Sequence, residues 1–352
     1  MESHNLPPTL FPIFAREGRS RTKYKSGFID VSGSVVIPPT YDHAHPFRSG
    51  RAAVRLGEKW GAIDESGDLV IRPRFSGPLV FTEGLAQFTL PGDRRGVVDL
   101  NGDVVIPARY GFVSYFSDGI ACVQTDELYG FIDRFGREVI PPFFEDARAF
   151  SEGLAAVKLG GKWGYIRPDG STAIPYQFLC ENGMAGPFRQ GLARVAKDGK
   201  WGHINRDAEF VVAPRFDMAY EFSEGMAEVQ LAKRRGFVGL SGELLIDTVY
   251  IHVGSFSDGL AQVNVGTGEA HKSIADACEV GFIDKAGNFA ISPRFFNAGR
   301  FQFGLCLVGT ESNIGYINRS GDFVWKSGWV EIGSLDPHHL LPPESVKRRE
   351  SQ

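Results

Sequence analysis

Residues 150–178 read FSEGLAAVKLGGKWGYIRPDGSTAIPYQF, and the pattern of this stretch recurs along the whole chain. Gly164 of the KWGYI segment serves as the reference position of each copy. Its equivalents are Gly27, Gly61, Gly96, Gly130, Gly202, Gly236, Gly281 and Gly315. The successive spacings of these nine glycines are 34, 35, 34, 34, 38, 34, 45 and 34 residues. A period of this length is typical of repeat architectures, so we expect a tandem array of about nine units.

Each unit predicts β-strands joined by tight turns. In the copy around Gly164, Ala155 and Val157 stand two residues apart, which places them on one face of a strand. An Asp-x-x-Gly step, such as Asp133 to Gly136, follows many of the reference glycines and predicts a hairpin: Asp caps the turn and Gly supplies a positive φ. An aromatic residue stands fourteen positions after the reference glycine in every copy: Tyr41, Phe75, Tyr110, Phe144, Phe178, Phe216, Tyr250, Phe295 and Trp329.

The predicted fold is therefore all-β, a repeated antiparallel meander. Three strands per unit correspond to the GLAAV, KWGYI and VVIP segments, and a possible short fourth strand, YDxAxxF, carries a small residue at its middle. A β-propeller-like ring is favoured, because the array begins and ends within a unit, so that the segment around Trp329 would complete the N-terminal hairpin. The alternative is an open β-solenoid of stacked hairpins, since about nine units exceed the usual range of 4–8 propeller blades.

These repeats define the expected domain boundaries. Residues 1–19 are interpreted as an N-terminal extension, residues 20–332 as the repeat array in a single domain, and residues 333–352 as a flexible C-terminal tail.

Composition excludes several classes of protein. The 352 residues are 43% hydrophobic and 23% charged, which argues against a wholly disordered chain. The formal net charge of −4 gives no positive field for nucleic acid, so no nucleic-acid partner is expected. No apolar run approaches the roughly 18 residues that would span a membrane, and the N-terminus is a poor secretory signal. We therefore expect a cytoplasmic protein without membrane insertion.

Candidate chemical groups are few, and each has a structural interpretation. The two histidines of Asp42–His45 could bind a metal, but they occupy variable positions typical of a solvated face. The basic clusters Arg94–Arg95 and Lys233–Arg235 are interpreted as solvated hairpin tips. The four cysteines, Cys122, Cys180, Cys278 and Cys306, form no CxxC pair and are interpreted as buried or incidental reduced thiols.

Two units carry extra residues. Four are added around Cys180–Met184, and eleven are added in the hairpin from Gly266 to Val280, which includes His271 and Cys278. Such insertions often decorate a binding face, although a tolerated loop extension is the simpler interpretation. No catalytic, cofactor-binding or metal-binding residue is predicted, so we do not expect an enzyme.

The Lys162–Ile166 motif KWGYI, preceded by FSEGLA at residues 150–155, resembles the bacterial WG-repeat (KWG-repeat) family. The resemblance covers roughly residues 20–330. Tryptophan precedes the reference glycine only at Trp60, Trp163 and Trp201, whereas arginine replaces it at Arg95 and Arg235. The resemblance implies a repeat architecture and no shared enzymatic activity.

Variable side chains on a repeated frame predict a non-catalytic scaffold that binds another macromolecule, a protein, through loops on one face. The alternative is a lectin-like module in which the nine repeated aromatic residues stack on the sugar rings of a glycan. No cofactor is expected for either function.

Overall fold

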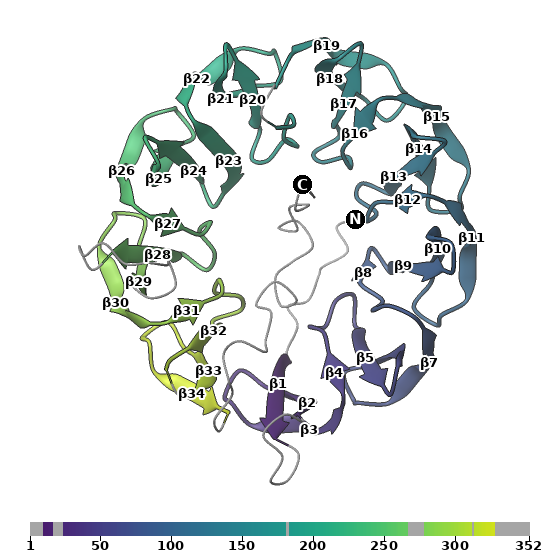
Figure 1. Ribbon diagram of the computed structural model, residues 1–352, viewed down its shortest axis with the longest axis vertical. Coiled ribbons are helices and arrows are strands. Elements are labelled where there is room, and N and C mark those ends of the chain that lie inside the picture. The colour runs from purple at the N-terminus through teal and green to yellow at the C-terminus, as the bar shows by residue number, and fades with distance from the viewer. Residues whose placement is uncertain (1–9, 17–23, 181–182, 267–277, 312, 328–352) are drawn as a thin grey trace. The chain divides into compact units, whose positions relative to one another are not determined.

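A computed structural model describes residues 10–16, 24–180, 183–266, 278–311 and 313–327 (Figure 1). Within these ranges the regular secondary structure consists of β-strands alone, and the strands form antiparallel sheets. The described residues form nine sheets in chain order, and each sheet has the antiparallel meander of a β-propeller blade. The sequence-based prediction of an all-β, propeller-like array of antiparallel meander units is confirmed.

The sheets follow one another along the chain. The first three sheets consist of β1 (Phe11–Arg16), β2 (Tyr24–Ile29) and β3 (Val35–Tyr41); β4 (His43–Ala44), β5 (Ala52–Leu56), β6 (Lys59–Ile63) and β7 (Leu69–Phe75); and β8 (Phe81–Thr82), β9 (Leu85–Leu90), β10 (Arg94–Val98) and β11 (Val104–Tyr110). The next three consist of β12 (Phe112–Val113), β13 (Ile120–Thr125), β14 (Leu128–Asp133) and β15 (Glu138–Phe144); β16 (Asp146–Ala147), β17 (Ala155–Leu159), β18 (Lys162–Ile166) and β19 (Thr172–Phe178); and β20 (Ala193–Lys197), β21 (Lys200–Ile204) and β22 (Phe210–Phe216). The last three consist of β23 (Met218–Ser223), β24 (Met226–Leu231), β25 (Arg234–Gly239) and β26 (Leu244–Tyr250); β27 (His252–Val253), β28 (Ala261–Gly266), β29 (Cys278–Ile283) and β30 (Phe289–Phe295); and β31 (Asn297–Ala298), β32 (Cys306–Gly309), β33 (Ile314–Ile317) and β34 (Phe323–Lys326).

The hairpin between the third and fourth strands of a sheet has the predicted Asp-x-x-Gly geometry. Between β14 and β15, Asp133 Oδ1 accepts hydrogen bonds from the amides of Phe135 and Arg137, both at 2.9 Å. Gly136 has a φ of +78°, which glycine adopts without steric cost. The side chain and the glycine together close the turn, as the sequence predicts.

The turn between the first and second strands is a second tight hairpin. Between β16 and β17, the amide and carbonyl groups of Ser151 and Leu154 exchange hydrogen bonds of 2.9 and 3.2 Å. The two residues inside this turn, Glu152 and Gly153, have φ values of +53° and +76°. Two consecutive positive φ angles in a two-residue loop define a type I′ turn, whose twist suits antiparallel strands.

The reference glycine is required by a close approach of the neighbouring strand. A Cβ at Gly164 on β18 would lie 2.7 Å from the carbonyl oxygen of Ile174 and 2.9 Å from the ring of Tyr176 on β19. The register shifts between β18 and β19 at this point, so β19 bulges across the glycine. The repeated glycine is therefore a packing requirement.

The core combines residues that the repeat fixes, such as Phe144 and Phe150, with residues that vary between copies, such as Phe131. Phe131 packs edge-on against Phe144 and Phe150, with ring centroids 6.4 and 4.9 Å apart. The small residue of the short first strand is also buried, as at Ala147 and Ala219. In residues 74–256, Figure 1 shows the first strands β8, β12, β16 and β23 at the inner edge and the last strands β11, β15, β19, β22 and β26 at the outer edge.

The chain forms two compact units, residues 74–256 and residues 1–73 together with 257–352. In the second of these units the first and last sheets contact each other. Tyr316 on β33 donates a hydrogen bond of 3.0 Å to the carbonyl oxygen of Pro12 on β1, and its ring packs edge-on against Phe11 at 5.5 Å. The two ends of the array therefore pack together.

The N-terminal sheet is completed differently from the prediction. Strand β1 lies within residues 1–19, which we assigned to an extension. It pairs with β2 along its whole length, with Phe11 opposite Ile29 at one end and Arg16 opposite Tyr24 at the other. An N-terminal strand therefore completes the first hairpin, and Trp329 lies outside the described residues. The prediction missed β1 because its sequence, FPIFAR, has apolar residues but none of the repeat's turn signals.

Candidate functional site

The two kinds of tight turn lie at the same end of each sheet. In a four-stranded antiparallel meander, the first and third turns are at one end and the second turn is at the other. We call these two sets of turns in residues 74–256 the turn face. It comprises residues 81–84, 116–119, 150–153, 188–191 and 222–225, and the hairpins at 99–103, 133–137, 167–171, 205–209 and 239–243.

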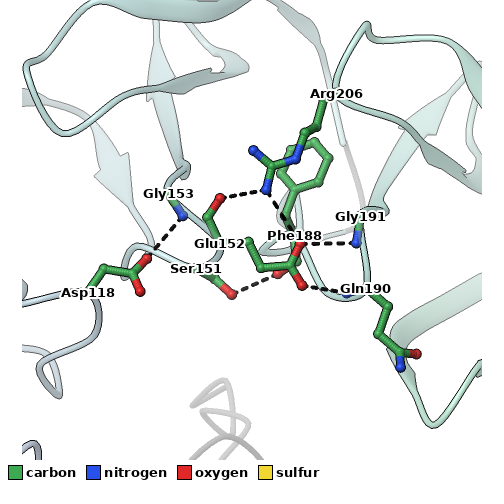
Figure 2. Close-up of polar contacts among 8 residues, drawn as sticks. All are labelled: Asp118, Ser151, Glu152, Gly153, Phe188, Gln190, Gly191 and Arg206. Carbon is green, nitrogen blue, oxygen red and sulfur yellow. Dashed lines mark hydrogen bonds and ion pairs between the residues drawn. The ribbon is translucent and has the colours of Figure 1, made fainter. Parts of the chain in front are cut away.

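Hydrogen bonds connect the turn between the first and second strands of one sheet to the same turn of the next sheet (Figure 2). The carboxylate of Glu152 accepts hydrogen bonds from the amides of Gln190 at 2.6 Å and Gly191 at 3.0 Å. The carboxylate of Asp118 accepts one from the amide of Gly153 at 3.0 Å. The same contact joins Glu83 to Gly119 at 3.1 Å and, through an amide oxygen, Gln190 to Gly225 at 2.8 Å. In four of these turns, the third residue thus holds the turn of the next sheet.

Two further contacts fix the same turns. The Ser151 hydroxyl donates to the carbonyl oxygen of Phe188 at 2.7 Å, and the same contact joins Ser223 to Phe256. Arg206 donates to the carbonyl oxygen of Glu152 at 2.6 Å, and its guanidinium lies 5.6 Å from the centre of the Phe188 ring (Figure 2). Backbone, hydroxyl and guanidinium groups therefore hold the turn face as a rigid frame.

The tips of this frame carry variable side chains. At the position occupied by Phe135 in the hairpin after β14, other copies have Asn101, Asp169, Asp207 and Ser241. Phe135 is 64% exposed, and the Arg137 guanidinium lies 5.2 Å from its ring centre. An exposed aromatic ring beside a cation, on a fixed backbone, is suited to contacts with another macromolecule.

The opposite ends of the sheets are fastened by acidic residues as well. Asp217 accepts a hydrogen bond from the Lys200 ammonium at 2.7 Å and another from the amide of Ala232 at 2.8 Å. The hydrogen bond with Lys200 lowers the pKa of Asp217 most, and the bond with the amide of Ala232 lowers it further. Asp42 makes the same pair of contacts with Lys25 and Gly57. These acidic residues act as turn caps.

A polar cluster, buried at His203 and half-buried at Arg194 and Glu221, lies in the sheets β20–β22 and β23–β26. The Arg194 guanidinium is 2.9 Å from the Glu221 carboxylate and lies over the Trp201 ring, 5.2 Å from its centre. His203 is fully buried, and its Nε2 donates to the carbonyl oxygen of Tyr220 at 2.7 Å. Burial lowers the pKa of His203 to about 4, so the imidazole is neutral near neutral pH. Burial raises the pKa of Glu221, and the positive charge of Arg194 lowers it. The net effect is a pKa below the ordinary value of a glutamate.

The predicted solvated face at Asp42–His45 is wrong for the two histidines. Both imidazoles are half-buried and pack against Trp60, with ring centroids 5.5 Å away for His43 and 5.1 Å for His45. Within the described ranges, no group of three or more His, Cys, Asp or Glu side chains could hold a metal ion.

The basic clusters divide into two kinds of residue. Arg94, Lys233 and Arg234 are exposed at hairpin tips, as predicted. Arg95 and Arg235 are half-buried instead: Arg95 lies over the Phe112 ring at 5.3 Å and Arg235 over the Tyr220 ring at 5.5 Å. Arg235 also forms an ion pair with the buried Glu228. The missed signal was an aromatic residue in a short strand: Tyr220 in the same sheet as Arg235, and Phe112 in the sheet after that of Arg95.

The cysteines agree with the prediction as far as they are described. Cys122, Cys180 and Cys306 are buried and free, and burial raises the pKa of each thiol. The side chain of Cys278 and the insertion at residues 267–277 lie outside the described residues, as do residues 181 and 182 of the shorter insertion. In the described part of the chain, no helix is long and apolar enough to cross a membrane.

Comparisons with known proteins support the repeat and the fold. Eight segments match the family described as WG containing repeat: residues 27–60, 60–90, 96–129, 129–163, 163–201, 201–233, 236–266 and 281–310. None of the curated proteins matches the chain by sequence.

Solved structures are similar in fold at low sequence identity. A eukaryotic initiation factor is 10% identical, with a TM-score of 0.61 over 91% of this chain and 96% of that chain. Dihydro-heme d1 dehydrogenase NirN is 14% identical, with a TM-score of 0.47 over 93% and 75% of the two chains. BamB from Moraxella catarrhalis is 12% identical, with a TM-score of 0.39 over 91% and 94%. At these identities the similarity concerns the fold alone.

Proposed function

Since this chain belongs to the WG containing repeat family, we propose that it is a non-catalytic cytoplasmic scaffold that binds a protein partner through the variable side chains of its turn face. Propeller folds commonly bind macromolecules, and the family implies a repeat frame without a shared active site. The proposal assigns the fixed hydrogen bonds to the frame and the variable tips to recognition.

The observation that carries this proposal is Phe135. Its ring is 64% exposed at the tip of a hairpin whose backbone is fixed by the Asp133 carboxylate. A rigid aromatic side chain can become buried in a partner with little loss of conformational entropy, which is the property of interface hot spots. Neighbouring tips on the same face supply polar side chains for a surrounding rim.

The lectin-like alternative has less support, because the repeated aromatic rings are inside the protein. Phe144, Phe216 and Phe295 are buried in the core, and Tyr41 and Tyr250 are half-buried. A ring that packs between strands is not available to stack on a sugar.

A comparison of two single variants of one sheet tests the proposal. Phe135→Ser removes the exposed ring from the turn face, whereas Leu128→Ser removes a side chain that is 40% exposed at the opposite end of β14. Each protein is immobilised and used to isolate partners from a lysate of the source organism. We expect the same partner with the wild type and Leu128→Ser, and its loss with Phe135→Ser. Retention by Phe135→Ser together with loss by Leu128→Ser would place binding at the opposite end.

A further inference from the structure

Strand β26 differs from the other seven-residue outer strands in lacking proline. The last strand of a sheet has one edge without a neighbouring strand, and proline there blocks pairing with another chain. Every other seven-residue outer strand has proline at its fourth or fifth position or both: Pro38 and Pro39 in β3, Pro73 in β7, Pro107 in β11, Pro141 and Pro142 in β15, Pro175 in β19, Pro214 in β22 and Pro293 in β30. Strand β26 has Asp247 and Thr248 there.

The exposed side chains of β26 also favour pairing. Leu245 is 48% exposed and Val249 is 59% exposed, and they alternate along the strand with the buried Ile246. Both are strand-compatible apolar residues on the outer face, in a strand of seven residues. An edge without proline and with exposed apolar side chains is the surface to which an extended peptide adds as a further strand.

The charge between these two apolar side chains selects the partner. Asp247 lies between Leu245 and Val249 on the exposed face, and its carboxylate makes no hydrogen bond or ion pair with the described residues. A cross-strand residue of opposite charge would stabilise the pair. In the same region, Arg234 Nη1 donates to the carbonyl oxygen of Val249 at 3.3 Å, which occupies that carbonyl.

We propose that the free edge of β26 binds an extended peptide segment of a partner protein by antiparallel strand addition. The segment carries a basic residue opposite Asp247 and apolar residues opposite Leu245 and Val249. This site is separate from the turn face and does not depend on the function proposed for that face.

A second copy of this chain fits the edge less well. In a symmetric antiparallel pair of β26 strands centred on residue 247, the two Asp247 carboxylates would be directly opposite each other. Like charges at directly opposed positions are destabilising, so the charge pattern disfavours self-pairing and favours a basic peptide.

The other outer strands provide a substitution that blocks the edge without disturbing the fold. Thr248 occupies the position of Pro39, Pro142 and Pro214, so the fold tolerates proline there. Thr248→Pro removes an amide hydrogen from the edge and imposes the constraint that the other strands already have. Leu245→Lys is a second variant, which places a charged side chain on the exposed face and leaves the backbone unchanged.

The experiment measures binding of a fluorescein-labelled peptide, Thr-Val-Thr-Lys-Thr-Val-Thr, by fluorescence anisotropy. We expect binding to the wild type and, from the loss of strand pairing, an affinity at least about tenfold weaker for Thr248→Pro and Leu245→Lys. Replacing the peptide's lysine by glutamate weakens binding to the wild type, and Asp247→Lys reverses this preference. Phe135→Ser, on the turn face, leaves peptide binding unchanged.

Several results would overturn the proposal. They are absence of peptide binding to the wild type, equal affinity for the wild type and a folded Thr248→Pro variant, and equal affinity for the lysine and glutamate peptides. Sedimentation analysis supplies another: a wild-type dimer that Thr248→Pro converts to a monomer would identify a second copy as the occupant. Failure of the turn-face proposal would instead appear as unchanged partner recovery by Phe135→Ser, so the two proposals fail independently.

Discussion

At the scale of single residues, copies of the repeat can keep an interaction between two side chains although the residues that make it differ. Arg95 replaces the tryptophan in one copy and lies over the ring of Phe112, on the short strand of the next sheet. Trp163 itself packs beneath the Arg148 guanidinium at 5.8 Å, and where Arg235 replaces the tryptophan, Tyr220 stands at the position of Arg148 and supplies the ring. The cation–π contact is therefore kept while its two members exchange strands. Sequence reasoning took each position separately and could not find this exchange, which depends on the pairing of the short strand with its neighbour.

The reference glycine allows a direct test at this scale. Replacing Gly164 by valine should destabilise the protein by about 2–4 kcal/mol, because the new side chain would collide with the Ile174 carbonyl and the Tyr176 ring. Gly111→Ala is the control, since a Cβ there would have no neighbour closer than 3.8 Å and the backbone has no positive φ. Urea unfolding of both variants provides the measurement. An unchanged midpoint for Gly164→Val would contradict the close approach.

His203 predicts a dependence of stability on pH. Its pKa is about 4 in the folded protein, below the ordinary value of 6.5, because burial disfavours the charged form. The unfolded chain therefore binds a proton that the folded protein does not bind between these pH values. Stability should be full above pH 6.5 and decrease by about 3 kcal/mol as the pH falls to 4.

His203→Phe is the matched variant for this pH dependence. Phe131, Phe237 and Phe282 occupy the equivalent position in other copies, so the fold accommodates the ring. Unfolding free energies measured from pH 7 to pH 4 should decrease less steeply for this variant than for the wild type. Parallel curves would assign the acid sensitivity to carboxylates instead.

At the scale of elements, sequence reasoning predicted the strands and hairpins but not the contacts that join one sheet to the next. The Asp-x-x-Gly turn could be predicted because Asp133 and Gly136 act within one hairpin. The role of Glu152 could not, because its partners, Gln190 and Gly191, belong to another sheet. Their distance is set by the stacking of sheets, and no local pattern encodes it.

The turn-to-turn contacts can be tested with two equivalent substitutions. Glu152→Ala removes the carboxylate that accepts two amide hydrogen bonds, so we expect a destabilisation of about 1 kcal/mol. Glu127→Ala is the control, because Glu127 also has a positive φ but its carboxylate makes no contact with the described residues. Thermal unfolding should show a lower midpoint for Glu152→Ala only. Equal shifts would mean that backbone strain, not the hydrogen bonds, determines the effect.

At the scale of the whole chain, the first and last sheets pack together as the favoured prediction required, but through different groups. The contact surface contains Phe11, Ile13 and Ile29 on one side and Leu305 and Tyr316 on the other. The sequence-based prediction invoked strand pairing between the chain ends. The observed contact is face-to-face packing of complete sheets, and two of its apolar residues, Phe11 and Ile13, lie on β1, outside the repeat motif.

Truncation after Asn318 tests this contact. It removes β34, whose Val324 and Trp325 pack against the same cluster of apolar residues. Amide hydrogen exchange at Phe28–Ile37 should become faster, although these residues are far from the cut in sequence, because their sheet loses part of its packing surface. Exchange in β14 serves as the internal reference. Unchanged protection at Phe28–Ile37 in a folded variant would show that the contact contributes nothing to stability.

The directional hydrogen bonds between turns have a consequence for how such an array can change in length during evolution. Each turn such as 150–153 accepts from the following turn through Glu152 and donates to the preceding one through the Gly153 amide. If one repeat were duplicated, the glycine amide of the new turn could donate to the carboxylate of the preceding turn, and its own carboxylate could accept from the amides of the following turn. Internal repeats can be gained or lost without leaving an unpaired group at the junction. The apolar contact between Phe11 and Tyr316 has no such interchangeable partner, so selection on copy number acts where the ends meet.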